Sequence, residues 1–164
     1  GDEIGMRYVE GLKSVEGGYN RTGSRSPMQW DDSTNAGFSS APASDLYIAM
    51  DPDKDRPTAK KEMAAPDSLY HEVKKLIRIR QSHKALQSRG KITFVYAEKN
   101  AYPLAYIRED GDEKILVIIN AAAEAKTFAC DAEPKEAIYN FGAAAEAKNG
   151  KITVPAQSAG FYRI

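Results

Sequence analysis

The sequence predicts a mainly β protein in which a loop-rich first part and one helix precede a region of short strands. Three observations predict this class: turn residues throughout residues 1–65, an amphipathic pattern over about 67–84, and short β-like runs from residue 90 onward. These runs are separated by turn residues every eight to twelve positions, which is typical of a sandwich or a barrel. With 164 residues, 42% of them apolar, the chain can bury a core as one large domain or two small ones.

Neither helical nor strand periodicity persists in the first part of the chain. Gly17-Gly18, Gly23, Pro27 and Pro42 are among the residues that interrupt it. A loop-rich stretch of this length is uncommon in a compact domain unless it serves a site or rests on structure elsewhere. We therefore expect residues 1–65 to belong with a site or with a neighbouring part of a larger protein.

The next segment has the pattern of a helix over about 67–84. Leu69, Val73, Leu76 and Ile77 fall at helical spacing, with charged and polar residues mainly on the other side. Asp67 or Ser68 precedes them, and either side chain can accept a hydrogen bond from an unpaired N–H of the first turn.

Seven β-like runs follow from residue 90. They are Ile92–Tyr96, Leu104–Ile107, Lys114–Ile119, Thr127–Cys130, Ala137–Tyr139, Lys151–Val154 and Gly160–Arg163. Asp110-Gly111 and Asn149-Gly150 predict hairpin turns because these residues tolerate positive φ. Two alanine-rich stretches, Ala121–Ala125 and Ala143–Ala147, favour helix, and we expect loops or single helical turns there.

Composition excludes several classes of protein. Cys130 is the only cysteine, so an internal disulfide and a CxxC metal or redox motif are excluded, while the compartment stays undetermined. Lys plus Arg and Asp plus Glu both number 23, so no net field attracts nucleic acid or anionic lipid. No apolar run approaches the ~20 residues that span a bilayer, and no signal segment opens the chain. Gly1–Met6 reads as the interior of a longer protein.

Isolated chemical motifs are weak in this sequence. Asp51, Asp53, Asp55 and Glu62 partly match a calcium loop, but Arg56 occupies the position where the sharp turn needs Gly, which favours a plain connecting loop. His71 and His83 are twelve residues apart and cannot form an i, i+4 metal pair. No nucleophile elbow, P-loop or dinucleotide fingerprint is present, so we expect no cofactor and no metal.

The most distinctive stretch is the loop Arg21–Ser39, written RTGSRSPMQWDDSTNAGFS. It resembles the RxxxR-[ST]-PMQW-[DS]-x-x-x-NAGF loop of glycoside hydrolase family 13, the α-amylase family, particularly its α-glucosidases and trehalose synthases. Gly1–Met6 resembles the GDEIGM segment that follows the last barrel strand in that family. Pro66–Arg80 resembles the eighth barrel helix, and Pro155–Tyr162 resembles the final strand of the C-terminal β domain.

The resemblance implies the end of a (β/α)8 barrel followed by a Greek-key β-sandwich. It divides the chain into 1–88, the end of the catalytic barrel, and 89–164, an all-β domain. The family retains configuration with an Asp nucleophile and a Glu acid/base held about 5–5.5 Å apart. These carboxylates match positions before Gly1, so we expect this chain alone to lack catalytic residues and to be inactive.

The resemblance also implies roles for four residues of the loop. The position matching the family's substrate-binding arginine is Arg21, and its guanidinium can donate several hydrogen bonds to sugar hydroxyls or a carboxylate. Trp30 is a second substrate-binding candidate by stacking, against the alternative of local packing. Arg25 and Asp31 are expected to hold the loop together. The run Arg7–Tyr19 departs from the family pattern, which leaves the substrate preference open.

The implied partners are an α-glucan or α-glucoside and the rest of the barrel, with no nucleic acid and no membrane. Hydrolysis and glucosyl transfer both stay open. A non-catalytic carbohydrate-binding module, with Tyr96, Tyr102, Tyr106 or Tyr139 as sugar contacts, is the alternative from another class. An interaction protein is a third, because the apolar side of the predicted helix needs a cover and favours self-association.

Overall fold

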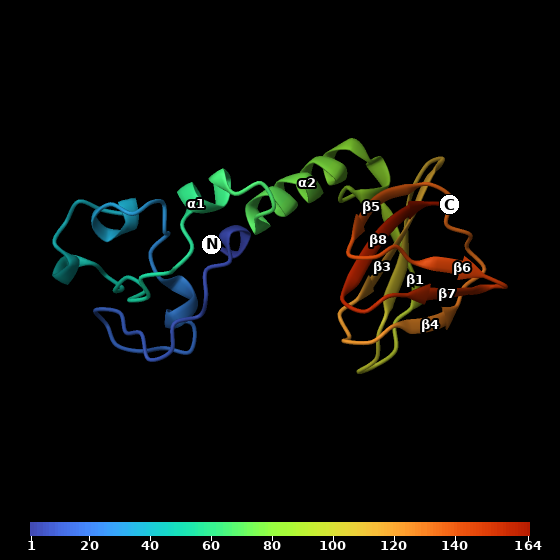
Figure 1. Cartoon of the computed structure of the whole chain (residues 1–164). Helices are drawn as coiled ribbons and strands as arrows, with labels where there is room; N and C mark the ends of the chain where they lie inside the picture. Colours follow the sequence, from blue (N-terminus) through green and yellow to red (C-terminus); the bar gives the residue numbers. More distant parts are fainter. The chain divides into compact units, whose positions relative to one another are not determined.

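The computed structural model describes all 164 residues, which divide into two compact units, Gly1–Leu76 and Ile77–Ile164. The division falls inside the helix α2 (Leu69–Ser82). The chain is mostly antiparallel β with few helices, so the predicted mainly β class is confirmed (Figure 1). The predicted domain limits at residues 88 and 89 rest on the family resemblance and stay a prediction.

The first unit is built from loops and short helical turns. Its 3-10 helices are η1 (Asp2–Ile4), η2 (Thr22–Arg25), η3 (Thr34–Gly37) and η4 (Ala43–Asp45). One short α-helix, α1 (Ala59–Ala64), was not anticipated from the pattern of the loop-rich part. The Thr58 side chain caps it by accepting from the Lys61 N–H at 3.2 Å, and Thr58 is buried.

The predicted helix is confirmed as α2, with ends two residues inside the predicted ones. The Ser68 hydroxyl lies 3.5 Å from the His71 N–H, a long capping contact. No residue of α2 is buried, and Leu69 and Ile77 on its apolar side are 46% and 52% exposed. The predicted amphipathic helix therefore forms, and none of its apolar side chains is fully buried.

The second unit contains the 3-10 turn η5 (Lys84–Leu86) and two antiparallel sheets. The five-stranded sheet has the order β1-β2-β3-β8-β5, and the three-stranded sheet has the order β4-β7-β6. The strands are β1 (Lys91–Tyr96), β2 (Leu104–Asp110), β3 (Glu113–Asn120), β4 (Lys126–Ala129), β5 (Ala137–Phe141), β6 (Glu146–Lys148), β7 (Lys151–Val154) and β8 (Ser158–Arg163).

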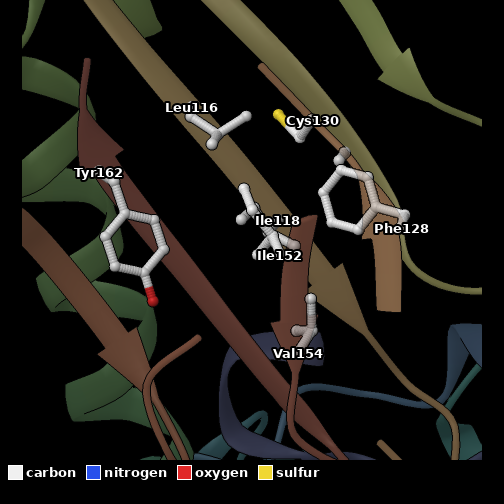
Figure 2. Close-up of a cluster of buried hydrophobic side chains, with 8 residues drawn as sticks. Leu116, Ile118, Phe128, Cys130, Ile152, Val154 and Tyr162 are labelled. Atoms are coloured by element: carbon white, nitrogen blue, oxygen red, sulfur yellow. The ribbon is translucent and has the colours of Figure 1, made fainter. Parts of the chain in front are cut away.

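The two sheets share one apolar core. Leu116 and Ile118 from the larger sheet meet Phe128, Ile152 and Val154 from the smaller one (Figure 2). Tyr162 and Cys130 complete the buried cluster. Leu116 and Ile118 are fully buried, which accounts for the almost continuous apolar run of β3.

The larger sheet is apolar on its outer face as well. Ile115 and Val117, which alternate with the core residues of β3, pack with Ala85 of η5 in a second buried cluster. Farther along the same face, Phe94 of β1 and Phe141 of β5 are 60% and 53% exposed. We call the side chains of Ile92, Phe94, Tyr106, Ile119, Phe161 and Phe141 the outer sheet face.

Both predicted hairpins form, and one alanine-rich prediction is wrong. Gly111 and Asn149-Gly150 adopt positive φ in two-residue turns, between Asp110 and Glu113 and between Lys148 and Lys151. Ala121–Ala125 is a loop, as expected. The stretch Ala143–Ala147 instead ends in strand β6, because cross-strand pairing of Glu146 and Ala147 with β7 outweighs the local helix preference.

Candidate functional site

The candidate site is the loop Arg21–Ser39 together with the segment Gly1–Tyr8, which lies against it. The Val9 N–H donates to the Gly23 carbonyl at 3.1 Å, so the two segments are joined through the backbone. Between them is a cavity of about 280 Å³. Its lining residues are Gly1, Asp2, Met6, Arg7, Tyr8, Ser24, Ser26 and Met28.

A bidentate ion pair anchors the first segment. Arg7 donates from Nε and Nη2 to the two oxygens of Asp51, at 2.9 and 2.7 Å. The Asp51 side chain is 2% exposed, and it also accepts the Asp53 N–H at 2.9 Å. The Arg7 guanidinium holds the pKa of this carboxyl below its usual range, although burial opposes the shift.

The second half of the loop is closed by its own backbone. Both the Trp30 N–H and the Asp31 N–H donate to the Ala36 carbonyl, at 2.8 and 3.2 Å. Asn35 and Ala36 have φ of 50° and 53°, a conformation that costs a non-glycine residue of order 1–3 kcal/mol. The Asn35 amide offsets this cost by donating to the Ser39 and Ala41 carbonyls at 2.9 and 2.8 Å.

Of the two residues expected to hold the loop, Asp31 makes local bonds and Arg25 makes none. The Asp31 carboxylate accepts from the hydroxyl and the N–H of Ser33, and these donors lower its pKa. It also faces Gly37, where a Cβ would come within 2.9 Å of a carboxylate oxygen. The Arg25 guanidinium is exposed and has no hydrogen bond or ion pair, so no bond in the structure supports a role in closing the loop.

The two predicted substrate-binding residues are both exposed and unpaired. Arg21 precedes η2, its backbone carbonyl accepts from Ser24, and its guanidinium makes no hydrogen bond or ion pair. Trp30 is 51% exposed. Neither residue lines the 280 Å³ cavity, so the structure does not bring them to that cavity.

The calcium alternative has no support in the structure. The Asp51 carboxylate is bound by Arg7, and the Asp53 carboxylate accepts the Asp55 N–H. No group of three or more His, Cys, Asp or Glu side chains is placed to hold a metal ion. Residues 51–57 form a loop.

The histidines and the cysteine have structural contacts. The His71 Nε2 lies 3.1 Å from the Met63 carbonyl, and the His83 Nδ1 lies 2.6 Å from the Glu113 carboxylate. Cys130 is buried, and burial raises the pKa of its thiol, which favours the protonated, less nucleophilic form.

Most of the tyrosines proposed as sugar contacts in the β region face packed surroundings. Tyr139 is buried beside Phe161, with ring centroids 5.1 Å apart, and Tyr96 packs against Phe128 at 5.5 Å. Tyr106 is half-buried beside Phe94. Tyr102 alone of the four is substantially exposed, at 47%.

Sequence reasoning missed Arg7 and Tyr8 as parts of the site. The only signal was the departure of residues 7–19 from the family pattern, and it did not say which side chains would be used. The partner of Arg7 is Asp51, 44 positions away, and the sequence pattern assigned Asp51 to a connecting loop.

Comparison with known proteins assigns the first half of the chain. The family model described as "Alpha amylase, catalytic domain" matches residues 1–89. The chain belongs to the α-amylase family. It is 30% identical over 135 residues to a glucan 1,6-alpha-glucosidase of Streptococcus pneumoniae, which covers 82% of this chain and 24% of that protein. It is also 30% identical to a probable alpha-glucosidase of Rhizobium meliloti, over 99% of this chain and 27% of that one.

A solved structure of the α-amylase family is similar over most of the chain. Trehalulose synthase MutB of Pseudomonas mesoacidophila matches 87% of this chain and 26% of its own chain, with 30% identity and a TM-score of 0.71. A variant of MutB has been solved in complex with its substrate sucrose. The chain thus spans about a quarter of the length of these relatives. None of its helices is long and apolar enough to cross a membrane.

Proposed function

We propose that these 164 residues supply the substrate-side loops and the β domain of a glycosidase that acts on α-glucosidic bonds, with catalytic carboxylates that lie outside them. The observation that carries the proposal is the match of the catalytic-domain model to residues 1–89, where the chain presents the loop Arg21–Ser39. Two further observations support it: relatives are named as glucosidases, and the chain covers only about a quarter of their length.

The carboxyl groups whose pKa departs from its usual value are suited to pairing with hydrogen-bond donors. A retaining glycosidase needs a carboxylic acid whose pKa is raised, so that it can protonate the leaving oxygen. The perturbed carboxyls here, Glu3, Asp31, Asp51, Glu113 and Glu124, all have a lowered pKa. Donors hold each of them as a carboxylate, which suits structural pairing and not proton donation.

Arg21 and Trp30 are the proposed substrate contacts of the loop. An exposed guanidinium without a partner keeps all five of its N–H donors for sugar hydroxyls or for a carboxylate. A half-exposed indole offers an apolar face for a sugar ring. The strained, internally bonded turn at Asn35-Ala36 would keep Trp30 in place without using ligand binding energy.

The β region is proposed as the Greek-key domain of the family, preceded by the end of its barrel. The outer sheet face supports this assignment, because an antiparallel sheet with apolar side chains on both faces needs a second cover. The rest of the barrel is the proposed cover in the complete enzyme.

The first test is an activity assay. The purified chain is incubated with isomaltose and with sucrose, and release of glucose is followed; we expect none. The coding sequence preceding Gly1 is then read, and we expect it to encode the Asp nucleophile and the Glu acid/base of the family. Turnover by the purified chain, after contaminating glucosidase has been excluded, would contradict the proposal.

The second test addresses the substrate-side role in the active protein. Arg21→Ala should raise KM for an α-glucoside about tenfold, because a charged hydrogen bond is lost. Arg25→Ala is the matched control, since Arg25 is equally free of partners and has no proposed ligand role. Equal effects of the two substitutions on KM would contradict the proposed role of Arg21 in substrate binding.

A further inference from the structure

The cavity between Gly1–Tyr8 and the loop Arg21–Ser39 contains an aromatic side chain that no part of the proposed function uses. Tyr8 lines it and is 53% exposed. The position lies in the run that departs from the family pattern, so the resemblance assigns it no role.

Tyr8 is held in place although half of it is open. Its hydroxyl donates to the Asn20 carbonyl at 3.3 Å, directly before Arg21 in the chain. Its ring rests on Gly23, where a Cβ would come within 2.8 Å of a ring carbon. The contact is therefore possible only because residue 23 has no side chain. The Tyr8 ring is consequently fixed at the cavity by its contacts with Asn20 and Gly23.

The polar groups around the ring are suited to a polyhydroxylated ligand. The Asp2 carboxylate and the Ser26 hydroxyl line the cavity and make no hydrogen bond or ion pair. Arg7 is fixed by Asp51 but remains 52% exposed. An aromatic face with a few oriented polar groups is the usual composition of a small-molecule pocket.

The volume restricts the ligand to a small one. About 280 Å³ is at the lower end of the range of roughly 300–1,000 Å³ for ligand pockets. It suits one sugar ring and not an oligosaccharide.

We propose that Tyr8 stacks on one sugar ring of the α-glucoside in this cavity and determines which sugar is accepted there. The substrate class in this inference rests on the proposed function; the stacking itself rests on the geometry of Tyr8, Gly23 and the cavity. Asp2 and Ser26 then orient the sugar hydroxyls.

The experiment titrates the full chain with sucrose, isomaltose and cellobiose, followed by amide NMR shifts. Sucrose or isomaltose should shift the amides of Tyr8, Ser24, Ser26 and Met28. Tyr8→Ala should weaken binding about tenfold, since an aromatic contact contributes up to about 1.5 kcal/mol. Tyr8→Trp should retain binding. Tyr47→Ala is the matched control, because Tyr47 is 54% exposed and does not line the cavity.

The outcomes separate the two proposals. Unchanged binding by Tyr8→Ala, or no shifts in the unsubstituted chain around the cavity, overturns the role of Tyr8 and leaves the proposed function to its own assay. Equal binding of cellobiose and isomaltose, both lost in Tyr8→Ala, supports the stacking and contradicts the α-glucoside class. If Tyr8→Ala does not fold, the shift map of the unsubstituted chain and the Tyr8→Trp titration decide the question.

Discussion

At the scale of single residues, the Arg7–Asp51 pair joins two distant parts of the first unit through a bidentate contact with a buried carboxylate. We expect Asp51→Asn to lower the free energy of unfolding by about 2 kcal/mol, because a buried, charge-assisted hydrogen-bond pair is lost. Trp30 lies in this unit, so its fluorescence during urea unfolding measures the change. Asp53→Asn is the control: its contact with Arg7 at 3.2 Å is more exposed and should contribute no more than about 0.5 kcal/mol.

The same pair predicts a dependence on pH. The folded-state pKa of Asp51 is lowered, so its stabilising contribution is complete above the unfolded value of about 3.9 and disappears as the pH falls through the lower folded value. Urea unfolding measures how far the free energy of unfolding falls between neutral and acid pH. This decrease should be smaller for Asp51→Asn than for the unsubstituted chain. An equal loss would mean that other carboxyls govern the acid response of this unit.

Residue-level prediction from sequence succeeded where a motif carries its own geometry. Local bonds explain Asp31, which binds Ser33 two positions away, while the substrate roles of Arg21 and Trp30 stay predictions. Prediction from sequence failed for Arg7, because its partner Asp51 is 44 positions away. A pair this distant depends on the tertiary fold and not on the local sequence pattern. The role of Tyr8 depends on Gly23 in the same way.

At the scale of elements, Glu113 connects the turn η5 with the β2–β3 hairpin. It accepts the Ala85 N–H at 2.9 Å, lies 2.6 Å from His83 Nδ1 and is 3.7 Å from Arg163. Burial raises the pKa of Glu113, but the Ala85 N–H, His83 and Arg163 outweigh it, so the pKa is lowered on balance. Its contribution is therefore present above the unfolded pKa of about 4.3 and is lost as the pH falls through the lower folded value.

Glu113→Gln should reduce stability at neutral pH by about 1–2 kcal/mol and flatten the acid dependence, because the charge that His83 and Arg163 bind is removed. Thermal unfolding followed by far-UV circular dichroism from neutral to acid pH measures both effects. Glu109→Gln, which breaks the exposed pair with Lys114, should change the stability by no more than about 0.5 kcal/mol. If the two variants behave alike, Glu113 is an ordinary surface acid.

The β6–β7 hairpin permits a test of backbone strain alone. Gly150 has φ of 68°, and a Cβ built there meets no atom within 4 Å. Gly150→Ala should therefore cost about 1 kcal/mol from the left-handed conformation and nothing from a clash. Chemical denaturation of the whole chain measures the loss, with Asn149→Gly as the control that should not destabilise. A neutral Gly150→Ala would mean that the turn changes type.

The elements themselves were mostly predictable, and the exceptions share one cause. Seven strands and α2 follow from the spacing of their apolar residues along the sequence. Strand β6 consists of three exposed residues, Glu, Ala and Lys, and this composition indicates helix. The segment is a strand because it pairs with β7. Helix α1 has only six residues and begins at the Thr58 cap. A helix this short gives too little periodicity to be detected in the sequence.

At the scale of the whole molecule, exposed apolar surface and the absence of net charge both favour association between chains. Phe94 and Phe141 on the outer sheet face and Leu69 and Ile77 on α2 are exposed, while the formal net charge at pH 7 is zero. Exposed apolar patches favour association, and a chain without net charge lacks the repulsion that opposes it.

We therefore expect the chain to self-associate most strongly near its isoelectric point of about 6.9, with the outer sheet face as the contact. Sedimentation velocity over a concentration series should show a rising average mass at pH 7 and a smaller rise at pH 9, where net negative charge separates the chains. Phe94→Ser and Phe141→Ser should each reduce the rise, because each removes apolar area from the contact. Val15→Ser is the control: Val15 is 77% exposed, belongs to the first unit and is not one of the residues of the outer sheet face. A folded chain that stays monomeric at every concentration, or a reduction equal for Val15→Ser, would show that the outer sheet face does not bind a second copy.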